Sequence, residues 1–130
     1  FHAAHVTLQG GDVALQIGAS GGPVQQARKS IGLLDRIGTG LEAHLSAIHV
    51  ASLVICGLTT PHCVSTSVRM AANLGFGVTL AHDACAAFAS NADHSWSDGP
   101  APDAEAIHRA AIDHLHGEFC TARSVAQILG

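Results

Sequence analysis

One sharp turn between two regular segments constrains this chain more than any other feature. Residues 53–57 are a continuous run of apolar residues and glycine, and such a run indicates a strand that is buried on both faces. Thr60 and Pro61 then suit the N-cap and the first position of a helix, because proline lacks an N–H group that the first turn would leave unbonded anyway. The sequence therefore predicts a strand, a turn, and a helix from Cys63 to about Leu74.

The turn places Cys63 where a thiol becomes reactive. The first N–H groups of a helix have no partners within the helix, and its positive dipole end favours a thiolate. A thiolate in this position can attack a carbonyl group and form an acyl-enzyme, while nearby N–H groups hold the oxyanion. Cys63 is the candidate nucleophile.

The remaining cysteines have a different environment. Cys56, Cys85 and Cys120 lie among apolar residues, and we expect them to be small buried hydrophobes. The four cysteines form no Cys-x-x-Cys pair and no zinc-module spacing, so they suit a reducing cytoplasm better than an oxidising compartment.

The rest of the chain alternates helical and strand patterns. A glycine-rich segment, residues 1–36, shows a strand-like alternation only at Asp12–Ile17, and residues 89–102 have the composition of a loop. Between and after these segments we predict a helix that opens at Gly38 or Thr39 with Leu41, Leu45 and Ile48 on one face, a buried strand at 77–81, a helix at 103–116 and a short strand at 119–123. This alternation predicts an α/β fold in which helices cover both faces of a parallel sheet.

Composition bounds the size and the partners. The 130 residues suffice for one domain, which we take as 1–130 with an atypical segment 1–36 and a core at 37–130. The net charge is −4 and the six lysine and arginine residues are scattered, so nucleic acid and anionic membranes are poor partners. The longest apolar runs are far too short to span a bilayer.

The run LVICGLTTPHCVSTSVRMAANLGFGVTLAHDACAAF, residues 53–88, resembles the signature of the isochorismatase-like cysteine hydrolases. The resemblance continues in three further segments, at 37–42, 104–108 and 115–119, and covers roughly residues 29–129. It implies a three-layer α/β fold, a homo-oligomer and a small-molecule substrate. We expect no cofactor.

The resemblance also implies roles for particular residues. The family uses a triad of cysteine, lysine and aspartate. Cys63 matches the nucleophile, and Lys29, the sole lysine in the chain, stands about where the family carries its lysine. The family's cis peptide would join Leu58 to Thr59, and the N–H groups of Thr59 and Cys63 would form the oxyanion hole.

The sequence departs from the family's pattern near its N-terminus. The family's aspartate lies in an Asp-x-Gln motif, which neither Asp12 nor Asp35 matches. We therefore expect the chain to begin after the family's first strand and helix and to lack the catalytic aspartate. His2 and His5 lack the Asp-x-His pattern of the metal-binding branch, so we expect strand-end histidines and no metal.

Several other side chains have less specific roles. His62 neighbours the nucleophile, but adjacent side chains diverge on a helix. Asp83 is expected to end its strand and bond to backbone groups, and Arg69 to pair across helices or subunits. Phe88 and Trp96 are as consistent with a pocket mouth as with packing under a loop.

Three functional hypotheses follow. The first is a hydrolase that cleaves the C–N bond of a small amide or carbamoyl compound through a Cys63 acyl-enzyme. The second is an isochorismatase-type hydrolase of a vinyl ether, which needs no covalent thiol. The third is a truncated, catalytically impaired family member with a scaffold role in an oligomer.

Overall fold

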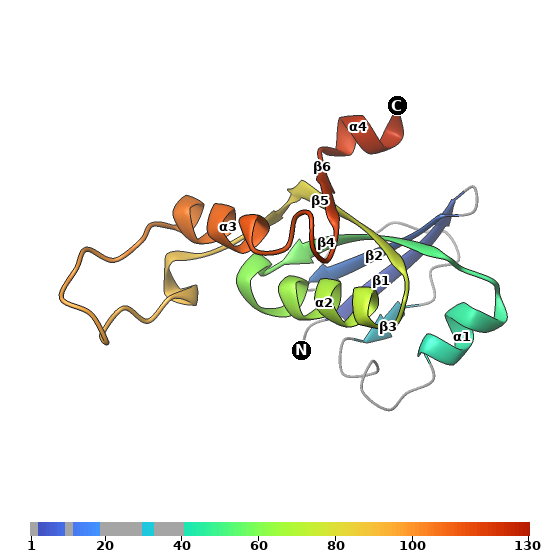
Figure 1. Ribbon diagram of the computed structural model, residues 1–130, viewed down its shortest axis with the longest axis horizontal. Coiled ribbons are helices and arrows are strands. Elements are labelled where there is room, and N and C mark those ends of the chain that lie inside the picture. Colours follow the sequence, from blue (N-terminus) through green and yellow to red (C-terminus); the bar gives the residue numbers. More distant parts are fainter. Residues whose placement is uncertain (1–2, 10–11, 19–29, 33–40) are drawn as a thin grey trace.

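A six-stranded sheet organises the fold (Figure 1). The structure, a computed structural model, describes residues 3–9, 12–18, 30–32 and 41–130. The strands lie in the order β3-β1-β2-β4-β5-β6. They are β1 (Ala3–Gln9), β2 (Asp12–Gly18), β3 (Ser30–Gly32), β4 (Ser52–Leu58), β5 (Gly77–Ala86) and β6 (Thr121–Arg123).

Most of the sheet is parallel. Strands β2, β4, β5 and β6 pair in parallel, whereas β1 is antiparallel to both β2 and β3. Gln9 of β1 pairs with Asp12 of β2, and only two residues separate them, while a parallel connection needs a dozen or more. The predicted parallel α/β sheet is confirmed, and the antiparallel hairpin is an addition that the sequence did not predict.

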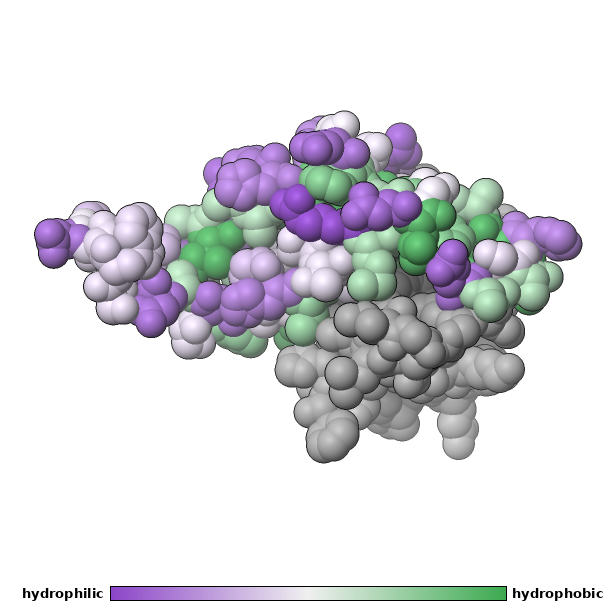
Figure 2. All heavy atoms as spheres, turned by 60° about the horizontal axis from the view of Figure 1, so that its bottom comes forward, coloured by the Kyte–Doolittle hydropathy of each residue, from purple (hydrophilic) through white to green (hydrophobic). Residues whose placement is uncertain are grey.

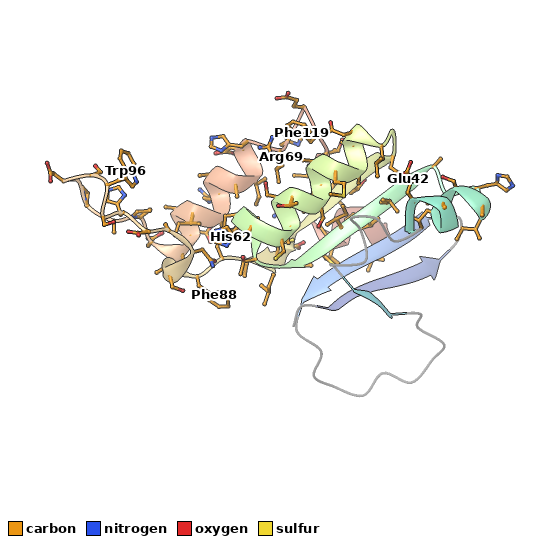
Figure 3. The ribbon with its side chains drawn as sticks, turned by 90° about the horizontal axis from the view of Figure 1, so that it is seen from below. Glu42, His62, Arg69, Phe88, Trp96 and Phe119 are labelled. Carbon is orange, nitrogen blue, oxygen red and sulfur yellow. The ribbon has the colours of Figure 1, made fainter. Side chains whose placement is uncertain are left out.

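Helices flank the sheet. They are α1 (Leu41–Ala47), α2 (Ser65–Asn73), α3 (Ala104–Asp113) and α4 (Val125–Leu129), with a π-helical turn η2 (Thr60–Val64) and a 3-10 turn η3 (Ala89–Asn91). Helices α2 and α3 lie next to each other (Figure 3), and the guanidinium of Arg69 on α2 donates to the carbonyl oxygen of His114 at the end of α3, at 3.4 Å. The predicted three-layer α/β class is confirmed. None of the helices in the described ranges has the length and apolarity needed to cross a bilayer.

The core lies between α2 and the sheet. The predicted inward stripe of the helix, Val64, Val68 and Ala71, is buried and packs in one cluster with Leu53 and Ile55 of β4. Burial alternates along β4, however, and Val54 is only partly buried. The prediction of a strand buried on both faces is therefore wrong for β4, because helix packing covers one of its faces more fully.

Two helix ends differ from their predictions. Helix α1 ends at Ala47, and Ile48, which was expected on the buried face, is 42% exposed. His49 follows with a φ of +58°, a left-handed conformation that an α-helix does not continue through. Helix α3 ends at Asp113 rather than at 116, although Leu115 beyond it is fully buried, as expected.

Two helix boundaries agree with their predictions, and one strand is longer than predicted. Gly75 has a φ of +90° just after α2, which confirms the predicted glycine stop. Asp103 caps α3, and its carboxylate accepts from the Ala106 N–H at 2.7 Å. Strand β5 runs to Ala86 and is longer than the predicted 77–81, because its final residues still pair with the end of β4.

Residues 87–103 form an arm that projects from the body of the molecule (Figure 1). Trp96 lies toward its far end and is 82% exposed, and Phe88 at its base is 52% exposed. Figure 2 shows a hydrophobic patch where the arm joins the body and more hydrophilic residues toward its tip. Neither aromatic side chain lines the cavities described below, and neither is packed under a loop.

Candidate active site at the β4–α2 turn

The turn after β4 has an unusual backbone. The peptide bond between Leu58 and Thr59 is cis, and Thr59 is extended with φ −105° and ψ 148°. The chain then enters the π-helical turn η2, in which Pro61 takes one of the first two positions. The N-cap is Thr59 rather than the predicted Thr60, and its side chain makes no capping bond. The π-helical turn η2 begins at Thr60, so the residue before it, Thr59, takes the cap position.

Two backbone bonds fix the turn on either side of the candidate nucleophile. The carbonyl oxygen of Thr59 accepts from the N–H groups of His62 and Val64, each at 3.2 Å. The N–H of Cys63 lies between these two donors in the sequence. Cys63 thus lies in a turn whose backbone is held on both sides, at the position where the family resemblance implies an oxyanion donor.

A buried serine holds the other side of Cys63. The hydroxyl of Ser67 donates to the carbonyl oxygen of Cys63 at 2.6 Å, and Ser67 is only 2% exposed. The Cys63 residue itself is partly buried and packs against the core cluster. The Ser67 bond therefore holds the backbone of Cys63 from the core side, while Cys63 remains partly accessible to solvent.

Burial raises the pKa of each of the other three thiols. All four cysteines are free, and Cys85 and Cys120 are buried. Burial raises the pKa of Cys85 from 9.0 to about 12 and that of Cys120 to about 11. Burial also raises the pKa of Cys56. Near neutral pH these three thiols stay protonated, so they are poor nucleophiles.

This contrast predicts selective alkylation. At pH 7.5 to 8, iodoacetamide should modify Cys63 in the folded protein at least about tenfold faster than Cys56, Cys85 or Cys120, because only a thiolate reacts and burial keeps those three thiols protonated. Peptide mass spectrometry measures each site, and protein in denaturant, where the four should react alike, is the control. Equal labelling of all four in the folded protein would contradict an activated Cys63.

Several predicted residues fall outside what the structure describes. Lys29, His2 and Asp35 lie outside the described residues. Asp12 begins β2 and His5 lies within β1, where only the backbone is described. The structure therefore tests neither the lysine nor the aspartate of the implied triad.

Other singled-out residues have structural partners. The guanidinium of Arg69 lies 4.4 Å from the centre of the Phe119 ring, which fits its predicted role between elements. The carboxylate of Asp83 accepts from the Val125 N–H at 2.8 Å and so holds the start of α4. The predicted bond of Asp83 to backbone is confirmed, but β5 continues past it. His62, which precedes Cys63 in the sequence, is exposed.

The sequence did not reveal the partner of Thr60. The hydroxyl oxygen of Thr60 lies 2.8 Å from Nδ1 of His108 on α3, and Thr60 is completely buried. The residues are 48 positions apart. Only the segment 104–108 of the family resemblance drew attention to His108, and that signal gave it no role.

Two adjoining cavities lie between the later part of β5 and α3, and no residue of the turn at 58–66 lines them. One has a volume of about 350 Å³ and the other about 500 Å³. His82, Glu105 and His108 line both. Within the described ranges, no group of three or more His, Cys, Asp or Glu side chains is arranged to hold a metal ion.

A mostly parallel sheet thus carries a partly buried cysteine into the turn that leads to α2, within an α/β architecture. Residues 32–127 match the isochorismatase domain model. The chain belongs to the isochorismatase family, and the resemblance stated from its sequence is confirmed.

Individual relatives support the same assignment. The chain is 43% identical over 93 residues to YrdC, an isochorismatase family protein from Bacillus subtilis, an alignment that covers 72% of this chain and 48% of YrdC. Streptothricin hydrolase from Streptomyces noursei is 44% identical over 50 residues, which are 38% of this chain and 18% of that enzyme.

Solved structures give the same result. A hydrolase of the isochorismatase family from Chromobacterium violaceum superposes with a TM-score of 0.61 and 40% identity, over 72% of this chain and 46% of that one. A cysteine hydrolase from Pseudomonas syringae has a TM-score of 0.61 and 25% identity, over 71% and 41%. The chain thus spans about half the length, or less, of the relatives it matches.

Proposed function

We propose that this hydrolase cleaves the C–N bond of a small amide or carbamoyl compound through an acyl-enzyme on Cys63. The Sγ thiolate attacks the carbonyl carbon, and the N–H groups of Thr59 and Cys63 hold the oxyanion. The C–N bond breaks, and the amine leaves with a proton taken from solvent. Water then attacks the thioester, which releases the acid, returns a proton to solvent and restores the thiolate, so the net reaction adds one water across the C–N bond.

The observation that carries this proposal is the turn itself. The bonds from the N–H groups of His62 and Val64 to the carbonyl oxygen of Thr59 hold the backbone on both sides of Cys63, and this supports a preorganised N–H donor beside the thiol. Cys63 also lies in the turn that leads into α2, a position that suits a nucleophile. Relatives named cysteine hydrolase and streptothricin hydrolase support a hydrolytic reaction.

We propose Lys29 as the second catalytic residue. It is the sole lysine of the chain and stands three positions before the matched family domain, which begins at residue 32. Its ammonium group would support the thiolate and orient the carbonyl. We also propose that the active form is a homo-oligomer and that it works in the cytoplasm.

The proposal is tested by the class of bond that the protein cleaves. We expect wild-type protein to release ammonia or an amine from members of a panel of small primary amides and carbamoyl compounds, and to leave vinyl ethers of similar size intact. A vinyl ether as the sole substrate would instead support isochorismatase-type chemistry. No turnover of any compound would support the impaired scaffold.

A further inference from the structure

We infer that His108 is a positioning residue, which holds the β4–α2 turn in place through Thr60 and thereby fixes the N–H groups that flank the thiol. The effect of His108 on turnover rests on the proposed function above. Its effect on the backbone of the turn does not, and it can be measured without a substrate.

The contact joins two separate elements. Thr60 opens η2 and is fully buried, and its hydroxyl lies 2.8 Å from Nδ1 of the partly buried His108. A buried hydroxyl left without a partner costs free energy, so this contact favours one position of Thr60. Neighbouring Ile107 is buried and Asp103 caps α3, so the imidazole extends from a well-anchored helix.

Thr60 controls the backbone on both sides of it. The peptide bond before Thr60 joins it to Thr59, whose N–H is one proposed oxyanion donor. Its carbonyl oxygen accepts from the Ser65 N–H, a bond that spans Cys63. A shift of Thr60 therefore moves both donors relative to Sγ, and small misplacements of catalytic groups cost rate.

The contact does not depend on one charge state of the imidazole. A hydroxyl can donate to a neutral Nδ1 or accept from a protonated one. His108 lines both cavities, whose other titratable side chains are His82, Asp83, Cys85, Glu105, Arg109, Asp113 and His116. What matters is a polar atom at the Nδ1 position, and an asparagine amide can supply one there, because its side-chain polar atoms branch at the same distance from the backbone.

Hydrogen exchange of the turn tests the inference directly. In His108→Ala, the amides of residues 58–66 should exchange about tenfold faster than in wild type, because the turn loses a hydrogen bond that holds it closed. His108→Asn should stay near the wild-type rate, and so should His114→Ala, the matched control on an exposed histidine of the same region. Mass spectrometry of peptides that cover the turn measures these rates. Unchanged exchange in His108→Ala, or equal acceleration in His108→Asn, would overturn the inference.

A second pair of variants approaches the contact from the other side. Thr60→Val removes the hydroxyl and keeps the shape, and it should accelerate exchange as His108→Ala does, whereas Thr60→Ser should not. This pair decides the question if His108→Ala fails to fold. Equal exchange in Thr60→Val and Thr60→Ser would also overturn the inference.

Kinetics then separates the inference from the proposed function. With a cleaved amide, His108→Ala should lower kcat by about tenfold and change KM by less than about twofold, because the donors act mainly in the transition state. If wild-type protein turns over no amide, the proposed function fails, while the exchange rates still decide whether His108 positions the turn.

Discussion

Replacing Cys63 with serine should lower the hydrolysis of any amide that the wild-type protein cleaves by a factor on the order of 10⁴ or more, as loss of a covalent nucleophile does in other enzymes. A hydroxyl is a far weaker nucleophile than a thiolate near neutral pH. Because serine differs from cysteine by one atom, the fold should persist. Steady-state release of ammonia or amine measures the loss.

The matched control is Cys56→Ala, which removes a thiol seven positions earlier. Cys56 lies in β4, and burial raises the pKa of its thiol. Its loss should leave turnover within about threefold of wild type, since surrounding residues tolerate a small volume change with a modest cost. Retained turnover in Cys63→Ser would rule out the acyl-enzyme.

Replacing Leu80 with alanine should lower the free energy of unfolding by about 2–5 kcal/mol, the range for large-to-alanine changes in a core. Leu80 lies in β5 and is fully buried in the cluster beneath α2. The change leaves a cavity in the core between the sheet and α2. Urea titration followed by far-ultraviolet circular dichroism measures the difference.

Leu129→Ala provides the comparison, since Leu129 is 77% exposed near the C-terminus. Surface substitutions of this kind usually change stability by less than about 0.5 kcal/mol. Similar losses in the two variants would mean that β5 does not form the centre of the core. A loss confined to Leu80→Ala would support the packing described here.

Local patterns predicted the parts of the fold that local physics decides. The apolar run before Gly57 predicted β4, and the spacing of Val64, Val68 and Ala71 predicted the buried face of α2. Gly75 marked the end of that helix. These signals depend on residues near each other in the chain, so a single sequence contains them in full.

Features that depend on distant residues were missed. The alternating burial of β4 depends on which helices pack against the sheet, and the bond from Thr60 to His108 joins positions 48 residues apart. At the site, the turn pattern in the sequence identified Cys63. The same pattern predicted Thr60 as the N-cap, because it does not distinguish a π-helical turn from an α-helical one. The role of Lys29 stays a prediction.

The projecting arm has a consequence for spectroscopy. Trp96 is the sole tryptophan of a chain that has no tyrosine, and it is 82% exposed. The intrinsic fluorescence of the folded protein therefore comes from a solvated indole, and its emission reports little about the core. The same indole is a fluorescent probe at a single position, and its emission should change when a molecule binds against the arm.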